Sequence, residues 1–374
     1  MPPGRTALST EVTERPSDQA PAPGSTWHRR MATAWARVFE GNLWILLILG
    51  VIVCFFTITS GTTFLATDNA RNIALDTSEV LLLTIGQTFV LITAGVDLSV
   101  GSVLVFSGVV AAKVMVAIAG KPTTTGVVGE SATSVVGPSG HVGLAIAGGL
   151  VAGLVAGTAW GAFNGWAVSR LRIPPLIVTL GTFGMALGVA NLLTNGVAVP
   201  DVPSELQSAV GSSDIAGAIP VPVAIAAVCV VVAFFLLHRT RFGRHTFATG
   251  SNPEAARRAG IRVSNHLVRV YAISGFLAGL AGMVDLARFD TITPSTHTTD
   301  NLNSIAAAAI GGTSLFGGVG TIVGGVIAAF IPAVLQNGLV IENIQPFWQQ
   351  VLVGAIIIVA VYIDQWRRRR RSSK

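Results

Sequence analysis

Long apolar segments recur along almost the whole chain and constrain its fold more than any other feature. Of the 374 residues, 51% are hydrophobic and only 11% are charged, a composition that a water-soluble domain would not need. A helix crosses the hydrocarbon core of a bilayer with about 20 mostly apolar residues. The pattern therefore predicts an all-α polytopic membrane bundle of about ten helices. The candidate segments are 42–60, 78–96, 101–119, 142–168, 173–194, 220–238, 266–287, 303–316, 318–340 and 347–364.

One of these segments, 303–316, is too short to cross a bilayer alone. It must be tilted, broken, or continued by the preceding loop. The basic residues test the count of ten, because Lys and Arg accumulate in cytoplasmic loops. With both termini inside, 20 of the 24 Lys and Arg lie on the cytoplasmic side. The basic balance therefore reports membrane orientation and does not indicate nucleic-acid binding.

The two ends of the chain differ from the middle in composition. Residues 1–41 are predicted to be a cytoplasmic and largely disordered tail, because their first part is rich in Pro, Ser, Thr and Ala. Residues 42–364 form the predicted transmembrane domain, and residues 365–374 a basic cytoplasmic tail that anchors at the anionic lipid of the inner leaflet. Cys54 and Cys229 both lie in apolar segments, so they predict neither a disulfide framework nor a metal site.

A polar, basic loop at 239–265 separates two apolar segments and is the predicted meeting place with a soluble partner. Its middle carries the start and stop signals of a short helix: an N-cap, a proline at the first helical position, an acidic first turn, a basic last turn and a terminal glycine. An ordinary capped loop helix without a partner is the alternative. The residues are Asn252, Pro253, Glu254, Ala255, Ala256, Arg257, Arg258 and Gly260.

Several polar residues interrupt the apolar segments and are candidates for a substrate pathway. Polar groups at membrane depth are costly and usually face a protein interior or a water path. Hydrogen bonding between helices explains them nearly as well, and Asp97 has a second interpretation as the N-cap of the helix that follows it. The candidates are Gln87, Thr88, Asp97, Asn164, Thr179 and Thr182.

Glycine supplies two further patterns. Gly149, Gly153, Gly157, Gly161 and Gly165 recur every four residues, which predicts close packing against another helix, inside the subunit or between subunits. At an offset of 217 residues, Gly, Leu, Val and Ala of the stretch 95–112 meet the same residue types in 312–329. The two copies run in the same direction in the predicted topology, so the repeat is parallel.

Taken together, five motifs carry a resemblance to a known family. The sequence resembles the membrane permease subunits of bacterial ATP-binding-cassette sugar importers of the ribose and xylose type. The motifs occur in the family's order and cover nearly the whole chain after the tail. They are "AGVDLSVGS" (94–102), "FNGWAVSRLRIPPLIVTLGT" (163–182), "GSNPEAARRAGI" (250–261), "IAAAAIGGTSLFGGVGT" (305–321) and "QNGL" (336–339).

The resemblance implies a homodimer of ten-helix subunits in the bacterial inner membrane, with a translocation path at the dimer interface. It also implies that the loop helix, through Glu254, Ala255 and Ala256, docks on a separate ATPase subunit that holds ATP-Mg, and that an external sugar-binding protein delivers a pentose or hexose. This chain would then have no catalytic residue, cofactor or metal. Two departures are a longer loop at 120–141 and a shifted acidic residue at Asp300 before the Ala-rich run.

Three other functions compete with a sugar permease. A permease of the same superfamily that carries branched-chain amino acids or another small polar solute is the first. An ion-coupled secondary transporter would need paired ionisable groups near mid-membrane, for which Asp97 and Asp285 are the only candidates. An enzyme is disfavoured because no nucleophile, base and metal cluster can be assembled and no Gly-Lys-Ser/Thr phosphate loop is present.

His297 is expected to be a solvated loop residue.

Overall fold

The computed structural model describes residues 26–120, 123–124, 135–136, 141–297, 299–345, 347–348, 351–352, 354–355, 358–359 and 362. The chain divides into two compact units, Met1–Gly41 and Asn42–Lys374. In the first unit, residues 26–41 form the beginning of helix α1 (Thr26–Phe64), so this part of the predicted disordered tail is helical. The rest of the predicted N-terminal tail and the basic C-terminal tail lie outside the described residues.

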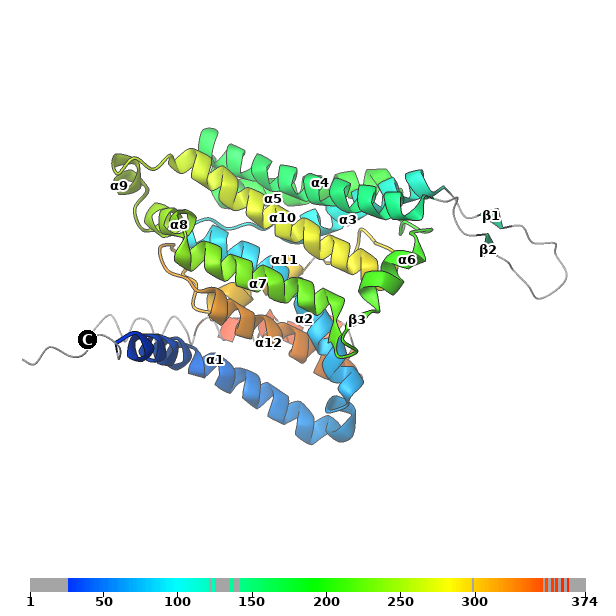
Figure 1. Cartoon of the computed structure of the whole chain (residues 1–374), viewed down its shortest axis with the longest axis horizontal. Helices are drawn as coiled ribbons and strands as arrows, with labels where there is room; N and C mark the ends of the chain where they lie inside the picture. Colours follow the sequence, from blue (N-terminus) through cyan, green and yellow to red (C-terminus); the bar gives the residue numbers. More distant parts are fainter. Residues whose placement is uncertain are drawn as a thin grey trace, which may run out of the picture. The chain divides into compact units, whose positions relative to one another are not determined.

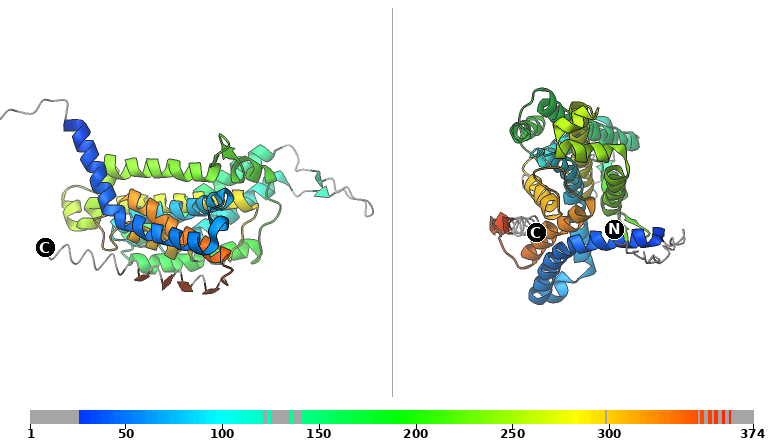
Figure 2. Two further views of the ribbon diagram at one scale, coloured as in Figure 1. Left: turned by 90° about the horizontal axis from the view of Figure 1, so that it is seen from below. Right: turned by 90° about the vertical axis from the view of Figure 1, so that its left-hand side faces the viewer.

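Long apolar helices make up the second unit, as the sequence predicted. In the part of the chain that the structure describes, eight helices are long and apolar enough to cross a membrane. Their axes are roughly aligned, with α8 and α9 at one end and α6 at the other (Figures 1 and 2). These helices are residues 42–64 of α1, α2 (Thr67–Ile92), α3 (Val100–Ala119), α4 (Val142–Arg170), α5 (Pro175–Thr194), α7 (Val221–Arg239), α10 (Val263–Phe289) and α12 (Ile322–Ile341).

Shorter elements connect the long helices. Four strands of two residues each form two antiparallel pairs, β1 with β2 and β3 with β4. The short elements are β1 (Thr123–Thr124), β2 (Val135–Val136), α6 (Ser204–Leu206), the π-helical turn Gln207–Gly211, β3 (Asp214–Ile215), β4 (Ile219–Pro220), α8 (Arg241–Ser251), α9 (Pro253–Arg258) and α11 (Asp300–Ile310).

Two of the ten predicted segments are not among the eight long helices. The 303–316 segment contains α11, whose 11 residues rise about 16 Å and cannot span a bilayer. The chain before α11 packs closely on α3: a Cβ at Gly101 would lie 2.6 Å from the carbonyl oxygen of His297. The preceding loop thus continues this short segment, which was one of the predicted solutions. Much of 347–364 lies outside the described residues, so ten crossings stay a prediction.

The glycine stripe of α4 packs inside the chain. A Cβ at Gly157 would lie 2.5 Å from the carbonyl oxygen of Gly275 on α10, and a Cβ at Gly161 would overlap the carbonyl oxygen of Tyr271. Gly149 and Gly153 meet backbone oxygens of α3 in the same way. These contacts confirm the predicted close packing and assign it to neighbouring helices of one subunit.

Both copies of the sequence repeat begin in a turn between two helices. The α2–α3 turn at 93–99 overlaps the start of the first copy, and the α11–α12 turn at 311–321 overlaps the start of the second. The two turns lie against each other, because a Cβ at Gly317 would be 2.8 Å from the Cβ of Ala94. The amide of Gly318 also donates a 2.8 Å hydrogen bond to the carbonyl oxygen of Ile92, the last residue of α2.

Candidate functional site

The predicted loop helix is present as α9, with the predicted end signals. The side-chain oxygen of Asn252 accepts hydrogen bonds from the amides of Glu254, at 3.1 Å, and Ala255, at 3.0 Å, as an N-cap does. Pro253 occupies the first helical position. Gly260 follows the helix with a φ of 85°, a left-handed conformation that glycine adopts without a Cβ penalty.

The surface of α9 is almost entirely open. Of residues 251–260, only Ala256 is buried, with 4% of its area exposed, so it anchors the helix to the rest of the protein. Glu254 pairs with Arg257 at 2.5 Å, and both side chains are more than half exposed. A surface pair of this kind contributes about 1 kcal/mol or less. The helix thus presents a short charged surface. The weak ion pair between Glu254 and Arg257 can break at little cost, so that both side chains can bind charged groups of a partner.

Immediately before α9, the chain meets the two repeat turns at a site that we call the glycine junction (Ile92, Ala94, Gly250, Ser251, Gly317 and Gly318). A Cβ at Gly250 would lie 2.8 Å from the amide nitrogen of Gly318 and would overlap the carbonyl oxygen of Ile92. A Cβ at Gly318 would lie 2.6 Å from the hydroxyl oxygen of Ser251. Three backbones are therefore in contact with almost no side chain between them.

A buried polar group, which we call the Asp97 network, joins several helices. The carboxylate of Asp97 accepts hydrogen bonds from the amide and hydroxyl of Ser99, at 3.0 and 2.6 Å, and from the hydroxyl of Ser274 at 3.3 Å. Gln87 donates to the backbone oxygen of Asp97 at 2.5 Å, and Asn164 donates to the hydroxyl of Ser99 at 2.8 Å. The residues of this network come from α2, the following turn, α4 and α10.

The alternative interpretation of Asp97 as an N-cap is wrong. Helix α3 begins at Val100, its N-cap position is Ser99, and no side chain caps it. The carboxylate of Asp97 instead binds Ser99 itself, one residue before the helix. Asp97 therefore organises the turn between α2 and α3 and bonds it to α10.

All six pathway candidates are buried in the single chain. Asp97, Gln87 and Asn164 belong to the network, and Thr179 donates to the backbone oxygens of Pro175, at 2.9 Å, and Val96, at 3.2 Å. Thr88 and Thr182 bond to backbone oxygens of their own helices. Hydrogen bonding within and between helices thus accounts for the contacts of these residues. Their role in a pathway stays a prediction.

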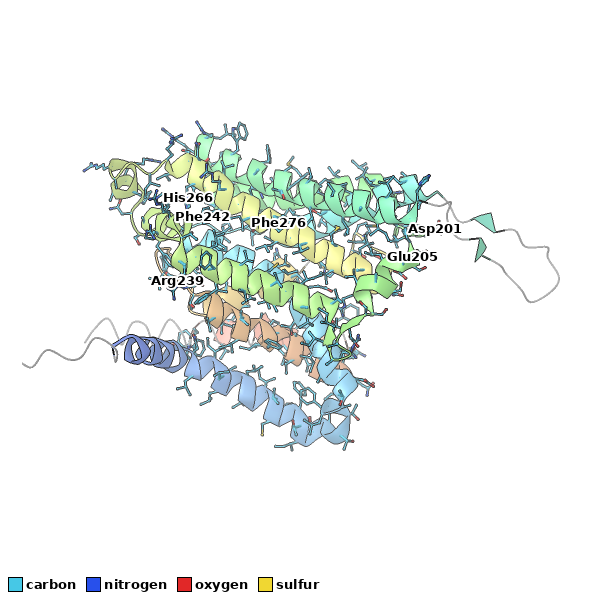
Figure 3. The ribbon with its side chains drawn as sticks, in the orientation of Figure 1. Asp201, Glu205, Arg239, Phe242, His266 and Phe276 are labelled. Carbon is cyan, nitrogen blue, oxygen red and sulfur yellow. The ribbon has the colours of Figure 1, made fainter. Side chains whose placement is uncertain are left out.

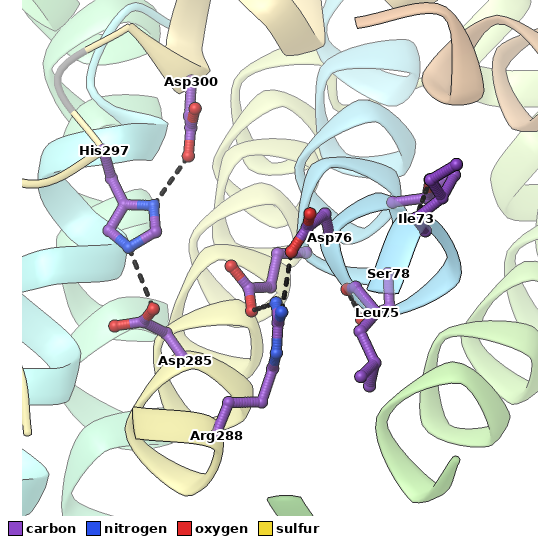
Figure 4. Close-up of polar contacts among 10 residues, drawn as sticks. Ile73, Leu75, Asp76, Ser78, Asp285, Arg288, His297 and Asp300 are labelled. Carbon is purple, nitrogen blue, oxygen red and sulfur yellow. Dashed lines mark hydrogen bonds and ion pairs between the residues drawn. The ribbon is translucent and has the colours of Figure 1, made fainter. Parts of the chain in front are cut away.

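A charge cluster (Asp76, Glu79, Asp285, Arg288, His297 and Asp300) lies between α2, α10 and α11 (Figure 4). Arg288 pairs with Asp76 at 2.7 Å and with Glu79 at 2.5 Å. His297 lies between two carboxylates: Nε2 is 3.1 Å from Asp285 and Nδ1 is 2.7 Å from Asp300. The cluster joins the segment before α11 to α2 and to the C-terminal end of α10.

The expectation that His297 is solvated is wrong, because only 14% of its side chain is exposed. Burial by itself lowers the pKa of His297, but the hydrogen bonds to Asp285 and Asp300 and the charges of these carboxylates raise the pKa further, to about 11. His297 is therefore a cation at neutral pH. The spacing of His297 and Asp300 was visible in the sequence, but their partner Asp285 lies on another helix.

The charge cluster also contains three side chains that could together hold a metal ion. Oxygens of Glu79 and Asp285 and a ring nitrogen of His297 lie within 4.8 Å of one another. Both ring nitrogens of His297 already face carboxylates, and Arg288 pairs with Glu79. This arrangement favours an ion-pair network over a metal site. Asp97 and Asp285, the two groups that an ion-coupled mechanism needed, belong to separate clusters.

These features define a polytopic helical membrane protein with a capped surface helix that follows the glycine junction. Residues 69–361 match the family model of the branched-chain amino acid transport system / permease component. The chain belongs to this family.

Relatives with assigned transport roles are similar over most of their length. The D-allose transport system permease protein AlsC of Escherichia coli (strain K12) is 35% identical over 85% of this chain and 90% of its own. The ribose import permease protein RbsC of the same strain is 34% identical over 90% of this chain and 96% of its own. The xylose transport system permease protein XylH of that strain is 30% identical, over 88% and 93% respectively. No solved structure matches the chain.

Proposed function

We propose that this chain is the membrane-spanning permease subunit of an ATP-binding-cassette importer and translocates a monosaccharide, a pentose or a hexose. The observation that carries the proposal is the similarity over most of the chain to permeases named for D-allose, ribose and xylose. The family description names branched-chain amino acids. These sugar permeases, which match at 30–35% identity, favour a sugar over that alternative.

The energy for transport comes from a separate ATPase subunit, which binds ATP-Mg. The sequence has no Gly-Lys-Ser/Thr phosphate loop of its own. Helix α9 is the docking element for that subunit, because it is capped at both ends, anchored by one buried residue and otherwise exposed. The docking residues are Asn252, Pro253, Glu254, Ala255, Ala256, Arg257 and Gly260.

The glycine junction supplies a mechanical route from α9 into the membrane domain. Gly250 and Ser251 are the last two residues of α8, and they contact the end of α2 at Ile92, where the α2–α3 turn begins, and the α11–α12 turn at Gly318. Backbone atoms in contact cannot move apart by rotating a side chain. Closely packed protein interiors are hard to compress, so a displacement on one side of such a contact is passed to the other side. A movement of α9 on ATP binding therefore displaces both turns together.

The functional unit is a homodimer in the bacterial inner membrane, with both termini cytoplasmic, supplied by an external sugar-binding protein. The path lies at the interface between the two copies. Gln87, Thr88, Asp97, Asn164, Thr179 and Thr182 hold the helices that form its wall, which fits their burial in the single chain. Their hydrogen bonds set the helix positions on which the width of the path depends.

Reconstituted uptake tests the substrate class. The permease, its ATPase and its binding protein would be placed in vesicles with ATP inside and supplied with ribose, xylose, allose, fructose or leucine. We expect ATP-dependent accumulation of one of the sugars and none of leucine. Accumulation of leucine alone would overturn the sugar assignment, and uptake driven by an ion gradient without ATP would overturn the importer class.

A further inference from the structure

A basic cavity of about 250 Å³ lies where α8, the α9–α10 connection and the first turns of α10 meet. Figure 3 labels His266 and Phe242 in this region, at the opposite end of the molecule from Asp201 and Glu205. The ring of His266, which lines the cavity, packs against the ring of Phe242 with 4.7 Å between the ring centroids. The lining residues that matter here are His245, Gly260, Arg262, Asn265, His266 and Arg269.

The cavity carries positive charge that the described part of the chain does not neutralise. No acidic residue lines it. Among the described residues, neither Arg262 nor Arg269 forms an ion pair, and both are exposed. Glu254, an acidic residue nearby in sequence, already pairs with Arg257. Two guanidinium groups facing one small cavity repel each other unless an anion lies between them.

Further hydrogen-bond donors point to the same kind of ligand. The side-chain oxygen of Asn265 accepts a 2.9 Å hydrogen bond from Arg170 of α4, which leaves the amide NH2 of Asn265 as a donor. Helix α10 begins at Val263 with no side-chain cap and no acidic residue in its first turn. The start of a long helix carries partial positive charge and unpaired amides, both of which favour an anion.

We propose that this cavity binds the phosphate of an anionic phospholipid headgroup. Arg269 and His266 lie on the first two turns of a candidate membrane span, so the cavity lies at the depth of the headgroups. The neighbouring end of α4 exposes Trp166 by 45%, one helical turn before the Arg170 that bonds to Asn265. Exposed aromatic residues are typical of the membrane interface. Basic pockets at helix ends on the cytoplasmic side bind anionic headgroups.

Native mass spectrometry of the purified full-length protein tests the proposal. Phosphatidylglycerol, phosphatidylcholine and inorganic phosphate would be added separately to the wild type, the double variant Arg262→Gln/Arg269→Gln and the control variant Arg241→Gln/Arg244→Gln. The control removes the same charge from exposed positions of α8 that do not line the cavity. We expect the wild type and the control to retain phosphatidylglycerol and not phosphatidylcholine, and the cavity variant to bind it at least tenfold more weakly.

Three results would overturn the proposal. Equal retention by both double variants would mean that the lipid binds elsewhere. Displacement of the lipid by millimolar inorganic phosphate would assign the cavity to a soluble anion, and displacement by the ATPase subunit would assign it to acidic side chains of that partner. Thermal unfolding verifies the fold of each variant, and the single variant Arg262→Gln, in the connection before α10, replaces the double variant if that one unfolds.

Discussion

The glycine junction and the charge cluster solve the same problem by opposite means. Each joins three segments that are distant in sequence. At the junction, Gly250 brings the end of α8 against the turns at Ile92 and Gly318 with no ion pair and hardly a side chain. In the cluster, Arg288 and His297 join α2, α10 and the segment before α11 through four carboxylates.

The difference shows how each region responds to change. Backbone contacts depend steeply on distance and leave no room for an added methyl group. Ion pairs act over longer distances and depend on protonation, but a buried charge that loses its partner becomes costly. We infer that the junction transmits movement and that the cluster holds its three segments in place. The predictions below probe this contrast.

The largest expected effect is that of Arg288→Ala. The substitution leaves the carboxyl group of Glu79 buried without its guanidinium partner, because only 7% of the side chain of Glu79 is exposed. Breaking a buried ion pair on one side costs about 3–5 kcal/mol of unfolding free energy. The loss of unfolding free energy should be near the lower end of this range, about 3 kcal/mol, because Asp76, the other partner of Arg288, is half exposed to water. Thermal unfolding in mild detergent measures the loss.

Arg71→Ala is the matched control for Arg288→Ala. Arg71 pairs with Asp214 at 2.8 Å, but both side chains are about one-third exposed, so we expect a loss of about 1 kcal/mol or less. Similar losses in the two variants would contradict the view that burial makes the charge cluster a structural clamp.

Gly250→Ala should destabilise the protein through the opposite mechanism. Its new methyl group would overlap the carbonyl oxygen of Ile92, and overpacking of this kind costs about 1–3 kcal/mol. Gly184→Ala is the control, since a Cβ there has no neighbour within 4 Å and alanine favours the helix. Unfolding midpoints should fall for Gly250→Ala only. A neutral Gly250→Ala would mean that the junction is loosely packed.

The cluster should depend on pH, whereas the junction should not. The pKa of His297 in the folded protein, about 11, lies above its ordinary value of 6.5. Its contribution to stability is therefore complete below pH 6.5 and is lost as the pH rises towards 11. The unfolding midpoints of wild type and His297→Gln should differ more at pH 6 than at pH 10. If the difference between the two unfolding midpoints did not change with pH, His297 would not be held as a cation.

The smallest expected effect on stability is that of Glu254→Arg on α9. An exposed acidic residue in the first turn contributes about 0.3–1 kcal/mol to a helix, and its pair with Arg257 lies at the surface. Co-purification of the ATPase should nevertheless fall, because the charge of the docking surface is reversed. Normal co-purification of a well-expressed variant would move the docking surface away from Glu254.

The local parts of this structure could be predicted from the sequence. The caps of α9 are encoded within nine residues, and the packing of α4 follows from a glycine at every fourth position. Both signals depend on neighbours along one helix. The sequence also showed that the 303–316 segment is too short to cross a bilayer alone, but it left open whether the segment is tilted, broken or continued by the preceding loop.

The parts that could not be predicted depend on single contacts between distant residues. Asp97 looked like an N-cap because it precedes a helix, but its partner Ser274 lies on α10. His297 was expected to be solvated because its loop is polar, but its ring binds Asp285, which lies on another helix. The motifs that contain Gly250 and Gly318 were visible, but no local pattern states that the two residues touch. One sequence carries no information on such pairings.

The central claim is that α9 moves the membrane domain through the glycine junction. ATPase activity and sugar uptake, both measured with loaded binding protein in the reconstituted complex, test it most directly in Gly250→Ala beside Gly184→Ala. We predict that Gly250→Ala co-purifies with the ATPase, as α9 itself is unchanged, but loses most of the uptake per ATP hydrolysed, while Gly184→Ala keeps it. Uptake per ATP equal to that of the wild type in a folded Gly250→Ala complex would contradict the account.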